Sequence, residues 1–145
     1  MRLTNHTDIP SDWIRSVIRA VRPGGISNFD VRVSNSSGHR GKGKAYTRGS
    51  GYHSTANPFI VVYVAKTEEK ARDLGLWRSG AYLQYATGSR REVFVAILAH
   101  ELRHLWQAKH TRGMVYGARG RYSERDADAY ALQMLRRYRR GELGI

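Results

Sequence analysis

The 145-residue sequence contains no cysteine, few prolines, and 12 acidic residues against 25 lysines and arginines. The absence of cysteine excludes a disulfide framework and any thiolate metal site, so a bound metal must be held by nitrogen and oxygen atoms. No apolar run reaches the roughly twenty residues of a membrane-spanning helix, and residues 1–5 show no basic-plus-apolar leader. We therefore expect a cytoplasmic protein without a membrane segment.

The shortage of acidic residues leaves a formal net charge of +13, which attracts polyanions. Segment 36–53 carries Lys42 and Lys44 among glycines and has no acid, which makes it one candidate for binding nucleic acid. Glycine and serine dominate this segment and favour a flexible hairpin or loop instead. Arg90 and Arg91 are the second candidate, because cations in the first turn of a helix oppose its dipole.

The most informative pattern in the chain is His100-Glu101-Leu102-Arg103-His104, which has the HExxH spacing of zinc proteases. At about 100° per residue, the two histidines project from one helical face within about 40° of each other, so they can share one metal. Glu101 then lies beside the metal, where a carboxylate can take a proton from a water that the metal activates.

The residues around this motif predict a largely buried helix, because apolar positions recur there at helical spacing. Ser89 and Glu92 fit a capping box at its start. Charged and imidazole groups inside such a helix are costly unless they bind something. The context therefore favours a metal site over a surface helix that happens to carry two histidines.

A catalytic zinc site usually has three protein ligands and one open position, so a third ligand is needed downstream. Residues 123–128 open a second helical pattern in which Glu124 and Asp128 lie one turn apart on one face. Glu124 would complete a site with two histidines and one carboxylate. Asp128 would accept the remaining ring N–H of His100 and fix its tautomer.

His110 is the alternative third ligand, since its distance along the chain also matches sites with three histidines. Those sites break the helix with a glycine at the position that Gln107 occupies here. If the helix continues through Gln107, the step from His104 to His110 rotates about 240° and turns the ring away from the metal. We therefore favour Glu124.

The two motifs together resemble the gluzincin branch of the zincin metallopeptidases, the group that contains thermolysin. In that branch a helix with HExxH is followed by a helix with ExxxD. The matching residues here are His100, Glu101, His104, Glu124 and Asp128. The resemblance covers roughly the last third of the chain at motif level, and small single-domain versions called minigluzincins are the most similar in size. It implies a zinc-dependent endopeptidase, with Zn²⁺ as cofactor and a peptide or protein as substrate.

Thermolysin takes an oxyanion-stabilising histidine from a helical C-terminal domain that has no counterpart in this sequence. Tyr116, Tyr122 and His110 are the candidates for that role here. Two other functions stay open. One is a DNA-associated protease similar to the SprT-like zincins, although those generally use a third histidine ligand. The other is a nucleic-acid or protein-binding module with a zincin-like core, which the intact Glu101 argues against.

Patterns in the rest of the chain predict an α+β fold for residues 1–145 as a single zincin-like domain. It comprises a backing helix near residues 13–21, strands at 29–33 and 59–64, and a short helix at 67–74, followed by the HExxH helix and a C-terminal glutamate helix. These helices would pack on a small mixed sheet. A further strand at 81–86 would either border the cleft and pair with substrate or only close the sheet. The pattern indicates no particular oligomeric state.

Overall fold

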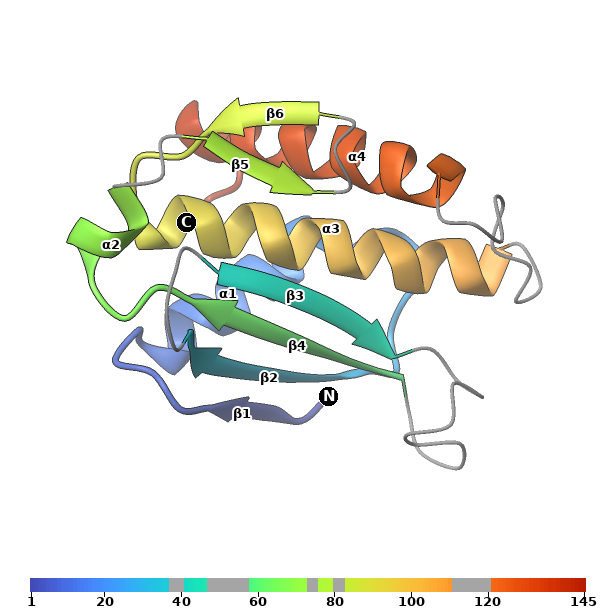
Figure 1. The fold of residues 1–145 in the computed structure, drawn as a ribbon. Coiled ribbons are helices and arrows are strands. Elements are labelled where there is room, and N and C mark those ends of the chain that lie inside the picture. The colour runs from blue at the N-terminus through green and yellow to red at the C-terminus, as the bar shows by residue number, and fades with distance from the viewer. Residues whose placement is uncertain (37–40, 47–57, 73–75, 80–82, 111–120) are drawn as a thin grey trace.

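The structure, a computed structural model, describes residues 1–36, 41–46, 58–72, 76–79, 83–110 and 121–145 (Figure 1). Within these residues it has a mixed α/β architecture, with a four-stranded mixed sheet, a two-stranded sheet and four helices. The strands are β1 (Leu3–Asn5), β2 (Asp30–Asn35), β3 (Gly41–Tyr46), β4 (Phe59–Val64), β5 (Leu76–Ser79) and β6 (Leu83–Ala86). The helices are α1 (Ser11–Val21), α2 (Glu68–Arg72), α3 (Arg90–His110) and α4 (Arg121–Arg139).

The larger sheet has the strand order β1-β2-β4-β3, in which β1, β2 and β4 run parallel and β3 runs antiparallel to β4. Strand β4 lies between β2 and β3, and its continuous apolar run suits this central position. Cross-strand partners Val33 and Val62 share the inner face of the sheet, and both are fully buried. Arg32, one position away from Val33, is exposed on the outer face.

Helix α3 lies between the four-stranded sheet and the pair formed by α4 and the β5-β6 sheet (Figure 1). It contacts β3 and β4 on one side, α4 on the other, and α1 as well. The side chains from Val93 to Leu98 are therefore at most 1% exposed. Enclosed in this way, the second half of the helix also buries the polar residues His100, Glu101 and Gln107.

Several helix boundaries follow the predicted signals. Helix α3 begins directly after Ser89, whose Oγ accepts a hydrogen bond from the backbone N–H of Glu92 at 3.1 Å. The carboxylate of Glu92 accepts a hydrogen bond from Arg139 instead of closing the second half of a capping box. Helix α4 begins at Arg121, two residues earlier than the start predicted at Ser123.

One expectation about the strands is wrong. The strand predicted within 81–86 is present as β6, but it does not close the main sheet, because it pairs with β5 in a separate two-stranded sheet. Residues 41–46, in the segment expected to form a hairpin or loop, are β3, an edge strand that pairs antiparallel with β4 and contacts α3. Strand β3 lacks the usual apolar alternation because its inner positions include Gly41 and Gly43, which lie against α3 without side chains. Among the described residues, none of the helices has the length and apolar character that crossing a membrane requires.

Candidate metal centre

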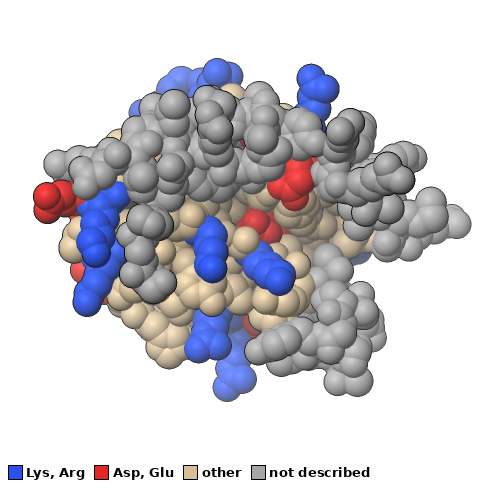
Figure 2. Space-filling model, viewed as in Figure 1, with Lys and Arg blue, Asp and Glu red and all other residues tan. Residues whose placement is uncertain are grey.

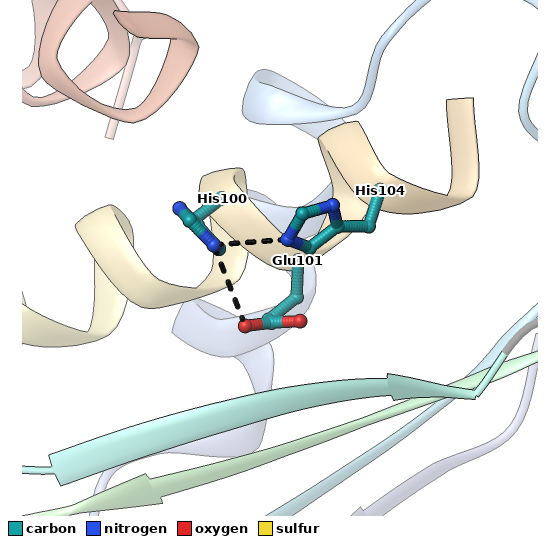
Figure 3. A group of neighbouring side chains, drawn as sticks. All are labelled: His100, Glu101 and His104. Carbon is teal, nitrogen blue, oxygen red and sulfur yellow. Dashed lines mark hydrogen bonds and ion pairs between the residues drawn. The ribbon is translucent and has the colours of Figure 1, made fainter. Parts of the chain in front are cut away.

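His100, Glu101 and His104 lie close together on α3, on the stretch of the helix that passes β3 (Figure 3). One helical turn separates the two histidines, and their Nε2 atoms are 3.0 Å apart. Glu101 Oε1 lies 3.9 Å from His100 Nε2. His100 is 2% exposed and Glu101 is 7% exposed, so these polar groups are held inside the fold. The helical spacing in the sequence predicted this proximity.

Helix α4 adds Glu124 to the histidine pair. Glu124 Oε1 lies 2.7 Å from His104 Nε2, and its Oε2 lies 3.2 Å from His100 Nε2. The packing of α4 along α3 brings this carboxylate to the same side of α3 as both imidazoles. Two nitrogen atoms and one carboxylate therefore meet at one point, although they come from helices far apart in the sequence.

The outer nitrogen of each imidazole faces an oxygen atom, which determines where the ring protons lie. Asp128 Oδ1 is 3.0 Å from His100 Nδ1, and Gln107 Oε1 is 2.9 Å from His104 Nδ1. Since a carboxylate and an amide oxygen can only accept protons, we assign the ring protons of the neutral imidazoles to the Nδ1 atoms that face them. The lone pairs of both Nε2 atoms then point toward each other and toward Glu124. Three converging electron-pair donors with no proton among them are suited to a cation.

The size of this triangle fits a transition metal. A tetrahedral zinc ion with bonds of about 2.0–2.1 Å holds its ligand atoms about 3.3 Å apart. The two Nε2 atoms are 3.0 Å apart, His100 Nε2 lies 3.2 Å from Glu124 Oε2, and His104 Nε2 lies 2.7 Å from Glu124 Oε1. Imidazole and carboxylate ligands suit zinc and also other divalent first-row metals. His100, His104 and Glu124 thus fit a metal with three protein ligands and leave the side toward Glu101 for another group.

The charges at the site favour a cation in the same place. Burial raises the pKa of Glu124, but hydrogen bonds from His100 and His104 lower it more, to well below its usual range. Burial lowers the pKa of His100, yet contacts with Asp128 and Glu124 outweigh burial and raise it to about 9. Without a metal, the carboxylates therefore hold a proton on the imidazoles. Burial raises the pKa of Glu101 against the opposing charges of His100 and His104.

Asp128 lies directly behind His100 and is fully buried. Its Oδ1 is 3.0 Å from His100 Nδ1, but neither carboxylate oxygen has a hydrogen bond of regular geometry within the described chain. We regard the contact as mainly electrostatic, because the distance is short while the angle is unfavourable. A buried carboxylate without regular hydrogen bonds is costly unless a positive charge lies beside it. A cation on the far nitrogen of His100 supplies that charge.

A second line of contacts supports His104, and the sequence interpretation missed it. The amide nitrogen of Gln107 donates to Asp126 Oδ2 at 2.9 Å. Arg103 donates to both oxygens of Asp126, at 2.7 and 3.2 Å, and its guanidinium lies 3.7 Å from the ring centroid of Trp106. An amide three residues after a histidine lies on the same helical face, so the i,i+3 relation was the available signal.

Of the other residues proposed for the reaction, His110 is described by the structure, and it does not join this cluster. Helix α3 continues through Gln107 to His110, as the argument against His110 as a ligand requires. His110 is exposed, its Nδ1 lies 2.9 Å from the carbonyl oxygen of Trp106, and its ring stacks on the Trp106 ring. Tyr116 and the side chain of Tyr122 lie outside the described part of the chain.

The four basic residues considered for nucleic-acid binding occupy different environments. Arg90 is 7% exposed and donates to the carbonyl oxygen of Ala65 and to Asp8, each at 2.7 Å. It joins the start of α3 to the end of β4, so we remove it from the candidate nucleic-acid surface. Arg91 is exposed, with its guanidinium 4.6 Å from the ring centroid of Trp13. Lys42 and Lys44 are exposed on β3.

Strand β3 runs directly past Glu101. A Cβ atom on Gly43 would lie 2.7 Å from Glu101 Cγ and 2.5 Å from Ile97 Cγ2, so only glycine fits this approach without displacement. Because β4 is the strand paired with β3, no other strand among the described residues pairs with the second edge of β3, and we call this its open edge. Figure 2 shows acidic side chains recessed in the middle of this face, with Lys and Arg side chains on the surface below them.

Comparisons of the chain with protein-family models, with curated proteins and with solved structures find no match.

Proposed function

We propose that the protein is a zinc-dependent metallopeptidase of the gluzincin type. One observation carries the proposal: the Nε2 atoms of His100 and His104 converge with the Glu124 carboxylate, and Glu101 stands beside them. A site with three ligands and an adjacent free carboxylate is the arrangement of a catalytic centre. A structural zinc is normally closed by a fourth ligand and needs no neighbouring base.

In this proposal His100, His104 and Glu124 hold the metal, and Glu101 moves the proton. Zinc bound there would supply Lewis acidity to a water molecule and to the scissile carbonyl. Glu101 takes the proton from the attacking water and returns it to the leaving amine. Its burial raises its pKa, which makes the carboxylate a better proton acceptor than an exposed glutamate.

The supporting residues keep the two rings in position for this chemistry. Asp128 and Gln107 face the Nδ1 atoms of His100 and His104, at 3.0 and 2.9 Å. These contacts fix each tautomer so that Nε2 faces the metal, and they limit rotation of the rings.

The open edge of β3 supports a peptide as the substrate. An extended peptide can add to such an edge through main-chain hydrogen bonds, which recognise any sequence. Gly43 brings this strand against Glu101, so a peptide bound there would pass beside the proposed base. The close approach of β3 to α3 would therefore place the backbone of a bound substrate peptide next to the residue proposed to help cleave it.

The test replaces Glu101 by glutamine, with Glu69→Gln as the matched control on an exposed position of α2. We expect Glu101→Gln to keep stoichiometric zinc and to lower cleavage of an unfolded protein by about 10²- to 10⁴-fold. Glu69→Gln should retain both properties. Undiminished cleavage by the Glu101→Gln protein would remove Glu101 from the mechanism, and absence of zinc from the unsubstituted protein would reject the proposed centre.

A further inference from the structure

Strand β3 presents its two lysines on the outer face of the sheet, away from α3. Alternation along the strand places Gly41 and Gly43 on the inner face and Lys42 and Lys44 on the outer face. Lys42 pairs across the sheet with Tyr63, and its Nζ lies 5.3 Å from the Tyr63 ring centroid. The apolar parts of both lysines can rest on the sheet while their charges stay in water.

These two charges have no acidic partner in the part of the chain that the structure describes. Other cations do have one, as in Arg90 with Asp8, Arg103 with Asp126 and Arg139 with Glu92. In the described strands of the larger sheet the single acid is Asp30, whose Oδ1 accepts a hydrogen bond from the backbone N–H of Arg2. The surface beside the open edge of β3 is therefore positively charged and uncompensated.

A peptide strand added to that edge would run about 4.8 Å from β3. Side chains directly opposite each other on one face have Cβ atoms about 4.5–5.5 Å apart. Peptide residues opposite Lys42 and Lys44 would thus be two positions apart and would both point to the outer face. The residue between them would lie opposite Gly43, on the side where Glu101 stands.

We propose that the substrates are peptides with acidic side chains at positions i and i+2, which pair with Lys42 and Lys44. This inference rests on the proposed peptidase function. Opposite charges directly across two strands favour pairing by about 1.5- to 5-fold each. Two such pairs give about 2- to 25-fold tighter binding than a neutral peptide of the same length. The general field of a +13 protein adds attraction for any anion but has no preference for spacing.

The experiment measures binding of labelled peptides to the zinc-loaded Glu101→Gln protein, so that cleavage does not interfere. Three peptides differ only in two residues: Glu at i and i+2, Glu at i and i+1, or Gln at i and i+2. We expect the first to bind about 1.5- to 5-fold more tightly than the second, because adjacent residues point to opposite faces of a strand and only one of them can pair with a lysine. Equal affinity of the two acidic peptides would overturn the proposal, since net charge alone would then explain binding.

Charge reversal assigns the effect to the two lysines. Lys42→Glu with Lys44→Glu should abolish the spacing preference and transfer it to a peptide with Lys at i and i+2. The control, Lys66→Glu with Lys70→Glu, makes the same change in net charge at exposed positions outside β3 and should keep the preference. If both double variants lose the preference for the i,i+2 spacing, or if both keep it, the preference does not come from Lys42 and Lys44. Should the β3 variant fold poorly, Lys42→Ala with Lys44→Ala must still remove the preference.

Two further measurements separate this inference from the proposed function. A spacing preference in binding, with no cleavage by the unsubstituted protein, would reject the peptidase and leave the acidic-peptide site standing. Cleavage without any spacing preference would reject the site and leave the peptidase. If a single-stranded oligonucleotide loses affinity in the β3 variant while the peptides do not, the lysines serve nucleic acid and the proposal is wrong.

Discussion

Gln107 Oε1 lies 2.9 Å from Nδ1 of His104, one helical turn further along α3. The other end of the same amide donates to Asp126, so the side chain is held from both sides. Gln107→Ala removes the acceptor for the Nδ1 proton and frees the His104 ring to rotate. We expect zinc affinity to fall by about 10- to 100-fold, as for other partners that orient metal-binding histidines.

Competition with a chromophoric chelator measures this change, and Gln133→Ala, at an exposed position of α4, is the matched control. Equal zinc affinity of the Gln107→Ala and unsubstituted proteins would show that the ring needs no support from this amide.

Removing Glu124 and removing His110 should have opposite effects on the zinc content of the protein. Glu124 contacts both Nε2 atoms, at 3.2 and 2.7 Å, whereas His110 is exposed and stacks on Trp106. Glu124→Ala should therefore abolish stoichiometric zinc after dialysis, and His110→Ala should retain it. Elemental analysis of the two purified variants decides between these ligands. Zinc lost from the His110 variant and kept by the Glu124 variant would reverse the assignment.

The parts of the site that could be predicted from sequence are those set by one helix. The spacing of His100, Glu101 and His104 determines their proximity once the segment is helical, and the helix follows from its apolar pattern. The position of Glu124 required a second helix to pack alongside, which periodicity does not determine, so Glu124 was suggested by the need for a third ligand and by the resemblance to a known motif pair. The structure places that carboxylate beside both imidazoles.

The features that the sequence did not predict, in β3 and at Arg90, depend on contacts between separate helices and strands rather than on the spacing of apolar residues along the chain. The extent of strand β3 within the expected hairpin or loop could not be predicted, because two of its inner positions are glycines and the reason for glycine lies in the contact with α3. Arg90 was interpreted as a surface cation, but its partners are Asp8 and the carbonyl oxygen of Ala65, 82 and 25 residues away. A pattern in the neighbouring residues carries no information about partners at such distances.

Gly43 should be intolerant of even a methyl group. An added Cβ would lie 2.5 Å from Ile97 Cγ2, 2.7 Å from Glu101 Cγ and 3.0 Å from Glu101 Oε1. Either β3 or the Glu101 side chain must move, which we expect to destabilise the fold by about 1–3 kcal/mol. Peptide cleavage should fall in the same variant because the moved groups are the proposed base and the strand beside it.

Urea unfolding and a cleavage assay measure both effects of Gly43→Ala. Gly24→Ala is the control, since no atom lies within 4 Å of its added Cβ and the residue is exposed. If Gly43→Ala is as stable and as active as the control, β3 does not approach α3 as closely as described.

The pH dependence of the metal-free protein follows from His100. Its pKa is raised from 6.5 to about 9 by Asp128 and Glu124, against the effect of burial. A group whose pKa is higher in the folded state contributes stability that is fully present below its unfolded pKa. That contribution is lost as the pH rises from 6.5 through about 9. Zinc must displace the same proton, so its affinity should increase over this pH window.

Two measurements check this linkage. Urea unfolding of the metal-free protein should show decreasing stability across the window, and the zinc-loaded protein should show less decrease because the metal replaces the proton. Calorimetric zinc titrations in buffers of different ionisation enthalpy should detect proton release near neutral pH. Zinc binding without proton release would mean that His100 is already neutral there, and that the two carboxylates do not hold a proton on the imidazole pair.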